Sequence, residues 1–532
     1  MKRMQRVVII YLFVSFLNLS SPAFIGKINA DDDVIQLDSG SIRGTVQDGA
    51  RFYAGIPYAA PPVGELRWKP PQPVAPWSGI RECVKFGPIC PQAPSPGMKE
   101  EDIKTASEDC LYLNIWAPLK KSADKKPVMV WIHGGAFVVG SGSSETYNGT
   151  NYAKNGVVIV TLNYRLGAFG FLAHPLLSDE SPHGISGNYG LLDQIEALKW
   201  VKRNIAAFGG DPENITIFGE SAGSISVGFH TVIPRSGGLF NRVIMESGAP
   251  MANPYILPLA TGSMSQALKT GVRFADSLGC SGKIDILAAM RTKTSGEILA
   301  ITPVPPDFAF ARKGMMFAPV YDGWLFPEDP EKIISSGKQR NVPLLIGTNK
   351  NEATIFITGL TMVKYREWVN RTFGDFALHI FSMFPIGEKE DLFEVADKVC
   401  TLLWFQQPAR HLAGSMADLN KSIYLYQFTR VSPKNEEEKQ TGAFHSCELP
   451  YVFGNIGRKE WHEEYDIFLS ETIMSYWINF ASKGDPNSLG LPEWPAYNRE
   501  NNINLEFGNK VAIKIDLDKK ASDLIEKFRL GN

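Results

Sequence analysis

Short apolar runs alternate with amphipathic stretches over most of the chain. Six runs are almost continuously apolar, and they span residues 128–132, 157–162, 215–218, 243–245, 343–346 and 423–428. Runs of this length and character are typical of strands that are buried on both faces of a parallel sheet. An alternating stretch over 34–45, followed by 52–56 across a turn at Gly49, predicts a small N-terminal antiparallel hairpin.

Helical spacing of apolar residues appears between these runs. One stripe recurs every three or four residues from Leu191 to Ile205 and stops at Gly209-Gly210, just before a proline. A second stripe runs from Met264 to Leu278 and ends at a glycine. Strands that alternate with helices predict the α/β class, with an open and mostly parallel sheet covered by helices on both faces.

The first thirty residues have a different character from the rest. Three basic residues within positions 2–6 precede an apolar run over 7–19, and small residues follow at Ala23 and Ala30. This order predicts a cleaved signal peptide over 1–30, with cleavage after Ala23 or Ala30. The alternative, a retained membrane anchor, is disfavoured because spanning a bilayer takes about 20 apolar residues. We therefore expect a secreted or periplasmic protein.

Composition narrows the function classes. The chain carries 54 Lys and Arg against 56 Asp and Glu, a net charge of −2, which argues against nucleic acid or an anionic membrane as the main partner. The six cysteines are too few for a disulfide-built scaffold and form no CxxC pair, so neither a metal nor a cofactor is expected. No repeat or long linker interrupts residues 31–532, which predicts a single domain with helical insertions.

The clearest chemical motif is Gly219-Glu220-Ser221-Ala222-Gly223, which directly follows the apolar run 215–218 and precedes a helical stretch. This is G-x-S-x-G in a strand-turn-helix context, the turn that presents a nucleophilic serine above the ends of a sheet. Glycines on either side leave room for the strand and the helix to approach closely. We therefore predict Ser221 as the nucleophile.

An ester carbonyl under attack develops negative charge on its oxygen, so the site needs preorganised hydrogen-bond donors. His133-Gly134-Gly135-Ala136 comes immediately after the apolar run 128–132, where an oxyanion loop is expected. We predict that the N–H groups of Gly135, Ala136 and Ala222 form the oxyanion hole.

The serine needs a base, and hydrolases with this turn carry their triad in the order Ser, acid, His. That order leaves His379, His411, His445 and His462. His379 and His411 fall in helix-like segments, whereas His445 lies in a loop beyond the run 423–428, where catalytic side chains collect. We predict His445 as the base.

The carboxylate that orients the histidine should follow a strand between Ser221 and His445. Glu352 follows the run 343–346 after a short polar turn. Asp322 is the competing residue, but it precedes Gly323, and an aspartate before a glycine is most often part of a turn. We predict Glu352 as the acid.

Together these segments resemble the type-B carboxylesterase family of α/β-hydrolases, which includes carboxylesterases, cholinesterases and some lipases. The likeness extends from about residue 34 to about residue 510, and further matching segments span 53–59, 108–114, 163–167 and 448–454. The resemblance implies the α/β-hydrolase fold, with Ser221, Glu352 and His445 as the triad and Gly135, Ala136 and Ala222 as the oxyanion hole.

The resemblance implies further structural features. It pairs Cys90 with Cys110 in a disulfide, whereas spacing alone leaves all fifteen pairings of six cysteines open. It also implies the ion pairs Arg67 with Glu108 and Arg165 with Asp193. A polar layer near His445 would consist of Glu220, Ser247 and Glu448.

Departures from the family pattern bear on the substrate. The cholinesterase branch has a choline-binding Trp inside its first disulfide loop, but no Phe, Trp or Tyr lies between Cys90 and Cys110. Choline esters are therefore not the expected substrates. Aromatic residues near the predicted pocket favour an apolar acyl or alcohol group, and they are Phe308, Phe310, Phe317, Phe356, Trp404 and Phe405.

The sequence thus predicts a secreted serine carboxylesterase that acts on small-molecule esters. Two alternatives stay open. One is a lipase-like esterase for longer acyl chains, although the loop between the two paired cysteines is short for a lipase lid. The other is a non-catalytic adhesion or binding protein on the same fold, although such proteins usually lack a triad residue. The oligomeric state is not predicted.

Overall fold

The computed structural model of the chain describes residues 34–94, 98–251, 263–302, 317–387, 391–457 and 462–531. The predicted signal peptide over 1–30 lies outside the described residues, as do Phe308 and Phe310. Among the described residues, no helix combines the length and the apolar character needed to cross a membrane.

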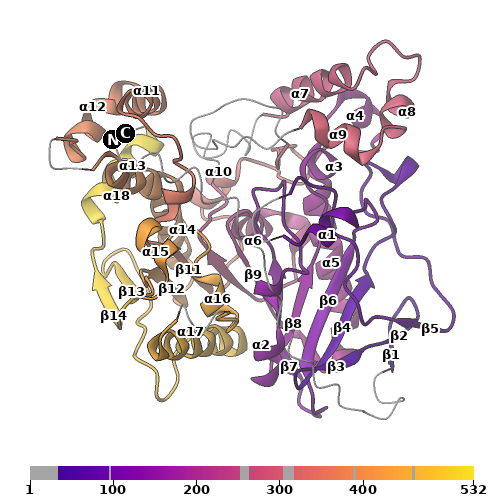
Figure 1. Cartoon of the computed structure of the whole chain (residues 1–532), viewed down its shortest axis with the longest axis horizontal. Coiled ribbons are helices and arrows are strands. Elements are labelled where there is room, and N and C mark those ends of the chain that lie inside the picture. The colour runs from indigo at the N-terminus through magenta and orange to yellow at the C-terminus, as the bar shows by residue number, and fades with distance from the viewer. Residues whose placement is uncertain are drawn as a thin grey trace.

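Eleven strands form one large sheet in the order β14-β13-β12-β11-β10-β9-β7-β8-β6-β4-β3. Their bounds are β3 (Thr45–Gln47), β4 (Ala50–Pro57), β6 (Tyr112–Pro118), β7 (Lys126–Ile132), β8 (Val158–Leu162), β9 (Gly210–Glu220), β10 (Arg242–Glu246), β11 (Leu344–Asn349), β12 (Ile423–Phe428), β13 (Ile503–Phe507) and β14 (Val511–Ile515). Strands β8, β7, β9, β10, β11, β12 and β13 are parallel to one another, and the pairings toward both edges are antiparallel. Figure 1 shows the twisted sheet crossing the molecule.

All six predicted runs form strands, β7 to β12. Their continuous apolar character is explained by packing on both sides of the sheet. Along β7, Val128 and Val130 belong to one buried core, whereas Met129 and Trp131 belong to another. Because neighbouring residues of a strand point to opposite faces, each face must have its own apolar cover. The predicted α/β architecture is confirmed.

Helices pack against both faces of the large sheet. Helices α5 and α6 pack into the first core, and α2, α16 and α17 pack into the second. The helices are α1 (Glu100–Lys104), α2 (Thr150–Lys154), α3 (Gly167–Phe171), α4 (Pro175–Glu180), α5 (Tyr189–Asn204), α6 (Ala222–Val232), α7 (Met264–Ser277), α8 (Ile286–Arg291), α9 (Ser295–Ile301), α10 (Pro330–Ser335), α11 (Met362–Phe373), α12 (Ala377–Met383), α13 (Leu392–Thr401), α14 (Gln407–Ala417), α15 (Glu436–Thr441), α16 (Leu449–Val452), α17 (Glu464–Lys483) and α18 (Lys519–Leu530). The two predicted helices correspond to α5 and α7.

The N-terminal hairpin differs from the expectation. Strands β3 and β4 do pair across Gly49, but they belong to the large sheet. The residues before them form β1 (Val34–Gln36) and β2 (Ser41–Arg43), which join β5 (Ile80–Glu82) in a separate small sheet. The chain passes between the two sheets at Gly44, where an added Cβ would lie 2.4 Å from the Tyr53 ring. A side chain does not fit at this crossing.

A third apolar core lies apart from the sheet. It is built by α11, α12, α13 and α18, together with a short 3-10 helix η6 (Glu352–Ile355) and a π-helical turn η8 (Leu402–Gln406). Figure 1 shows this helical region above the β11–β14 end of the sheet. It carries η6, the element that begins with Glu352, and so supports one side of the candidate site.

Candidate active site

Ser221 occupies a sharp turn between β9 and α6. Its backbone has φ 56° and ψ −122°, a conformation that is strained for any residue with a side chain. Glycines make the turn possible, because a Cβ on Gly219 would lie 2.6 Å from Ile132 O and one on Gly223 would lie 2.0 Å from the same oxygen. The Ser221 N–H donates to Glu246 O at 2.9 Å, which fastens the turn to β10.

The loop after β7 lies directly against this turn. A Cβ on Gly134 would lie 3.1 Å from Ser221 Cβ and 2.7 Å from Glu220 O. Gly135 and Ala136 both have positive φ, of 98° and 55°. Among the described residues, no hydrogen bond uses the N–H groups of Gly135 and Ala136. Ala222 is the first residue of α6, where an N–H has no partner within the helix. Three predicted donors therefore lie on segments that flank Ser221.

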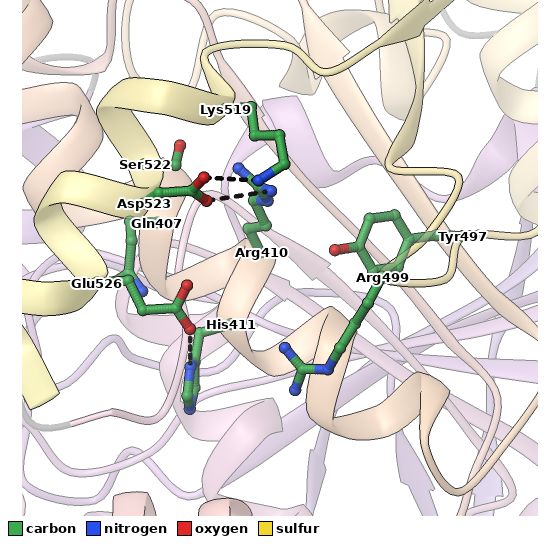
Figure 2. Close-up of a pocket in the computed structure, with 9 residues that line it drawn as sticks. All are labelled: Gln407, Arg410, His411, Tyr497, Arg499, Lys519, Ser522, Asp523 and Glu526. Atoms are coloured by element: carbon green, nitrogen blue, oxygen red, sulfur yellow. Dashed lines mark hydrogen bonds and ion pairs between the residues drawn. The ribbon is translucent and has the colours of Figure 1, made fainter.

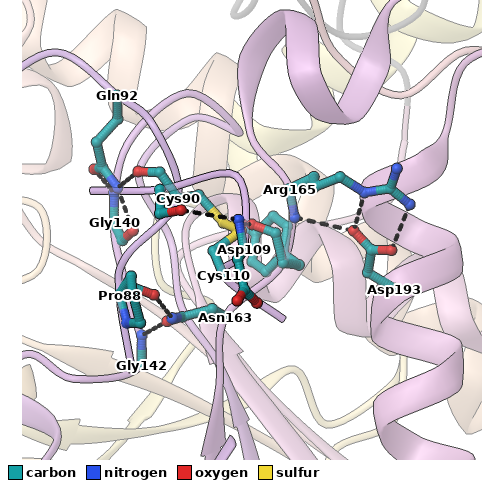
Figure 3. Close-up of a disulfide and its surroundings, with 12 residues drawn as sticks. Pro88, Cys90, Gln92, Asp109, Cys110, Gly140, Gly142, Asn163, Arg165 and Asp193 are labelled. Atoms are coloured by element: carbon teal, nitrogen blue, oxygen red, sulfur yellow. Dashed lines mark hydrogen bonds and ion pairs between the residues drawn. A yellow bond between two sulfur atoms is a disulfide. The ribbon is translucent and has the colours of Figure 1, made fainter. Parts of the chain in front are cut away.

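The far end of this loop is tied to the disulfide region. Cys90 and Cys110 form a disulfide with a Cα–Cα distance of 5.1 Å, as the resemblance implied. Two residues on, Gln92 accepts from Gly140 N at 2.6 Å and donates to Gly140 O at 2.9 Å (Figure 3). The segment that carries the disulfide thus fixes the end of the loop that begins at His133.

His445 and Glu352 meet beside Glu220, the residue that precedes Ser221. His445 lies in the loop between α15 and α16, and Glu352 begins η6, just after β11. The distance from His445 Nδ1 to Glu352 Oε2 is 2.6 Å, and the two side chains are 5% and 0% exposed. The rings of Phe356 and Phe405 lie 5.1 and 4.9 Å from the imidazole. The imidazole is therefore held by a carboxylate and by apolar walls.

Backbone pairing brings these two loops together. Asn351 N donates to Ala443 O at 2.9 Å, and Asn351 and Phe444 form an isolated parallel bridge. Asn349 N donates to Glu352 Oε1 at 2.7 Å, and its side chain donates to Phe444 O at 2.7 Å. Asp397 on α13 accepts from Ala353 N at 3.0 Å and from the Asn351 side chain at 2.9 Å. Neither Asn349 nor Asp397 belongs to a recognised sequence motif, so neither was predicted as a residue of the site.

The other imidazole nitrogen faces Glu220. The distance from His445 Nε2 to Glu220 Oε1 is 3.0 Å, and the Ser446 hydroxyl donates to the same oxygen at 2.6 Å. No hydrogen bond joins Nε2 to Ser221 Oγ in this structure. The structure therefore brings Glu352, His445 and Glu220 together, with Ser221 the next residue along the chain from Glu220.

These carboxylates set the charge of the site. Burial disfavours the charged imidazole, but Glu220 and Glu352 outweigh it and hold the pKa of His445 well above its ordinary value. Glu448 accepts a hydrogen bond from the Asn349 side chain, and its other oxygen has no partner. Burial, reinforced by Glu220 and Glu352, raises the pKa of Glu448 to about 8.

Glu246 is a fourth buried carboxyl that the sequence analysis missed. It ends β10, where it is the cross-strand neighbour of Glu220. Its Oε1 accepts from Trp477 Nε1 at 2.8 Å, and its Oε2 has no partner. Burial, strengthened by Glu448, raises the pKa of Glu246 well above its ordinary value. The sequence did carry a signal, since Glu246 ends an apolar run.

Ser247 directly follows Glu246 at the end of β10, and the alternative residues have partners of their own. Ser247 is buried with φ 52°, its hydroxyl has no partner, and no hydrogen bond joins it to His445. Asp322 accepts from three successive backbone N–H groups, those of Trp324, Leu325 and Phe326, so its carboxylate closes a turn. His379 stacks on Phe376, and His411 pairs with Glu526.

Both ion pairs implied by the resemblance are present and buried. Arg165 and Asp193 form a bidentate ion pair, with nitrogen–oxygen distances of 2.8 and 2.7 Å, shown in Figure 3. Arg67 bonds Glu108 at 2.6 and 2.5 Å, and its Nη1 also donates to Lys293 O. Within the described ranges, no group of three or more His, Cys, Asp or Glu side chains is arranged to hold a metal ion.

The chain matches known proteins over most of its length. A sequence model of the carboxylesterase family matches residues 31–525. A para-nitrobenzyl esterase of Bacillus subtilis is 38% identical over 500 residues, which cover 91% of this chain and 96% of that protein. A fumonisin B1 esterase of Sphingopyxis macrogoltabida is 36% identical, with 89% and 86% covered. A mouse cholinesterase is 34% identical, with 89% and 83% covered.

Solved structures agree with the sequence comparisons. A PNB esterase structure superposes with a TM-score of 0.79 at 36% identity and covers 93% of this chain and 99% of its own. A thermophilic PNB esterase superposes with a TM-score of 0.78 at 34% identity over the same shares of each chain.

Proposed function

The chain belongs to the carboxylesterase family and is a carboxylic ester hydrolase, and on this premise we propose that it acts through a Ser221-Glu352-His445 triad. The contact between Glu352 and His445 at 2.6 Å, beside the strained turn that carries Ser221, is the observation on which the proposal rests. An aspartate or glutamate hydrogen-bonded to Nδ1 keeps the proton there and leaves Nε2 free to act as the base.

In the first step, His445 Nε2 takes the proton of Ser221 Oγ while Oγ attacks the ester carbonyl carbon. For this Nε2 exchanges its contact with Glu220 for one with Ser221, because catalytic hydrogen bonds of free enzymes often tighten only with substrate bound. The tetrahedral intermediate collapses, the bond to the alcohol oxygen breaks, and Nε2 returns the proton to the leaving alcohol. An acyl-enzyme results.

In the second step, water attacks the acyl carbon while His445 takes a proton from that water. The bond between the acyl carbon and Ser221 Oγ then breaks, His445 gives the proton to Oγ, and the carboxylic acid leaves. In both steps the carbonyl oxygen becomes negatively charged. The N–H groups of Gly135, Ala136 and Ala222 stabilise that charge, and each such donor contributes about 10²–10³ in rate. The two loop donors are free for this role, since no described acceptor is bonded to them.

The test is Ser221→Ala with a p-nitrophenyl ester as substrate. We expect kcat to fall by about 10⁴-fold or more. Ser482→Ala, an exposed serine on α17, is the matched control and should keep full activity. A stoichiometric organophosphate adduct on Ser221 should appear in the wild type. Retained turnover in Ser221→Ala would refute the triad, and an inert wild-type Ser221 would favour the non-catalytic alternative.

We further propose that the protein is exported and that its signal peptide is cleaved after Ala23 or Ala30. The disulfide Cys90–Cys110 supports this, because such bonds persist mainly in oxidising compartments. N-terminal sequencing of protein recovered from the native host should begin after Ala23 or Ala30. A mature protein that still begins at Met1 would contradict export by cleavage.

For the substrate we propose uncharged esters with an apolar acyl or alcohol group. The apolar rings of Phe356 and Phe405 beside His445 support this, as does a relative named para-nitrobenzyl esterase. A panel of esters that varies acyl and alcohol length separately tests it. Strong activation on emulsified long-chain triglycerides would instead favour the lipase alternative.

A further inference from the structure

The carboxylate of Asp397 on α13 holds the chain on both sides of Glu352. Its Oδ2 accepts from the side chain of Asn351 at 2.9 Å, and its Oδ1 accepts from Ala353 N at 3.0 Å. Asn351 and Ala353 are the residues immediately before and after Glu352. One helical side chain therefore fixes both ends of the turn that presents Glu352 to His445.

Asn351 extends this link to the loop that carries the histidine. Its Oδ1 accepts from Ala443 N at 3.2 Å, and its N–H donates to Ala443 O at 2.9 Å, two residues before His445. Gly442 packs closely against the same amide, since it has φ 74° and a Cβ there would lie 2.5 Å from Asn351 Cγ. A chain of contacts thus runs from Asp397 through Asn351 to the loop of the imidazole.

Asp397 is both buried and charged. It is 3% exposed, and its Oδ1 also accepts from the hydroxyl of Thr401, one turn further along α13, at 3.1 Å. Burial raises the pKa of Asp397 to about 6, so the side chain is still ionised at pH 7. An ionised group is costly to bury unless it is well hydrogen-bonded. The three groups that donate to Asp397 are neutral, and two of them belong to the neighbours of Glu352.

We propose that Asp397 is a positioning residue for Glu352 and His445, and that it acts on both through Asn351. The proposal rests on the triad proposed above. Asp397 fixes the turn of Glu352 directly and the loop of His445 through the Asn351 amide, and so sets the 2.6 Å contact between Glu352 Oε2 and His445 Nδ1. A displacement of about 1 Å in either segment would break that contact, and misplacement on this scale can cost about 10²-fold in rate.

Exchanging the two side chains of the link tests the proposal. Asp397→Asn replaces one accepting oxygen by a donor, so one of the two bonds to the neighbours of Glu352 is lost. We expect kcat for a p-nitrophenyl ester to fall by about ten- to a hundred-fold, with KM changed by less than about two-fold. Asn351→Asp alone should also be slow, because two carboxylates then face each other.

The double variant, Asp397→Asn with Asn351→Asp, restores the pairing in reverse. The amide at position 397 donates to the carboxylate at position 351, whose second oxygen still accepts from Ala443 N. We expect kcat to recover to within about five-fold of the wild type, a coupling that two independent structural losses would not show.

Glu526→Gln is the matched control. Glu526 on α18 pairs with His411 on α14 at 3.0 Å at the wall of a polar pocket, as Figure 2 shows. It is also a carboxylate that joins two elements, but its partner lies in α14 and not in the turn of Glu352 or the loop of His445. Any loss of stability in this variant should leave kcat at the wild-type value.

Urea unfolding of each variant establishes that the assayed protein is folded. The proposal is overturned if folded Asp397→Asn keeps the wild-type kcat, or if the double variant stays slow or does not fold. If Asp397→Asn alone does not fold, recovery of kcat in the double variant decides in favour. Glu352→Gln separates this proposal from the triad, since a fall of about 10⁴-fold in its kcat supports the triad whatever Asp397→Asn does. Wild-type turnover in Glu352→Gln would refute the triad itself, and the positioning role with it.

Discussion

The imidazole of His445 lies between two carboxylates, with Glu352 at Nδ1 and Glu220 at Nε2. The Glu352 contact orients the ring. The Glu220 contact has a different consequence, because a carboxylate beside Nε2 stabilises the charged imidazole that cannot act as a base. The free enzyme therefore holds the proposed base in its protonated form, which cannot accept a proton, up to a higher pH than a free histidine, whose pKa is about 6.5.

Glu220→Gln should reveal this effect in the pH profile of kcat/KM. Activity requires neutral His445, so it falls as the pH drops through the His445 pKa, which lies well above the ordinary value. Removing one carboxylate destabilises the imidazolium and lowers that pKa. The midpoint of the acid limb should therefore move to lower pH in Glu220→Gln and stay in place in Glu471→Gln, an exposed change on α17. An unmoved midpoint in Glu220→Gln would contradict this assignment of charge.

Glu246 allows a second prediction, on stability. Its pKa in the folded chain is raised by burial, so the folded state holds a proton that the unfolded state loses above about pH 4.3. Stability therefore declines as the pH rises above that value, by at most about 1.4 kcal/mol per pH unit, until the folded-state pKa is passed. Glu246→Gln is neutral throughout and can keep the bond from Trp477.

Urea unfolding at pH 5 and at pH 8 measures the difference. We expect the free energy of unfolding of Glu246→Gln, taken relative to that of the wild type, to be higher at pH 8 than at pH 5. If the free energies of unfolding of Glu246→Gln and the wild type differ by the same amount at pH 5 and at pH 8, Glu246 is ionised in the folded protein at both values. Glu471→Gln, an exposed change on α17, again serves as the control.

At the scale of elements, the junction between β9 and α6 depends on close packing against β7. Gly223 is the second residue of α6, and a Cβ there would lie 2.0 Å from Ile132 O. Such an overlap can be relieved only by moving the helix away from the strand, which would also move Ser221. The glycine at position 223 is therefore a packing requirement of the turn that carries Ser221.

Gly223→Ala should consequently lower both activity and stability. Overpacking of this kind costs about 1–3 kcal/mol, and we expect a lower urea midpoint together with a large fall in kcat. Gly296→Ala on α9 is the matched helical control, because a Cβ there meets nothing closer than 4.0 Å. That variant should be at least as stable as the wild type. Wild-type kcat in Gly223→Ala would show that the turn tolerates displacement.

Elements with a strong local signal were predictable from the sequence. The six apolar runs became β7 to β12 because buried parallel strands need apolar residues on both faces. Strand β6 was missed because Asn114 interrupts its apolar run. That residue is 3% exposed and bonds the Thr161 hydroxyl at 3.1 Å, a pairing that only the tertiary structure supplies. The N-terminal hairpin was predicted in part, since alternation does not say which sheet a strand joins.

At the scale of the whole molecule, the site collects residues from distant parts of the chain. Chain order and loop position suggested Ser221, Glu352 and His445, since each follows an apolar run. Glu246 also follows an apolar run, but nothing in the sequence indicates its role, and Asn349 and Asp397 belong to no motif. The roles of these three residues come from burial and from hydrogen bonds across long sequence separations. The disulfide was implied only by resemblance, because cysteine spacing cannot select a pairing.

That disulfide links global stability to the loop after β7, which carries two of the proposed oxyanion donors. It joins residues separated by 20 positions, and Gln92 beside it bonds both the N–H and the carbonyl of Gly140. Replacing both Cys90 and Cys110 by serine should lower the free energy of unfolding by about 3 kcal/mol in the chain-entropy description. It should also lower kcat, since the segment that fixes the loop end is released.

Gln92→Ala in the oxidised protein separates these two effects. It keeps the disulfide but removes both bonds to Gly140, so kcat should fall while most of the stability remains. Urea unfolding and p-nitrophenyl ester turnover measured on both variants give the comparison. If the double serine variant loses stability yet both variants keep the wild-type kcat, the disulfide supports the fold alone, and the loop after His133 holds its shape through its own contacts with Glu220 and Ser221.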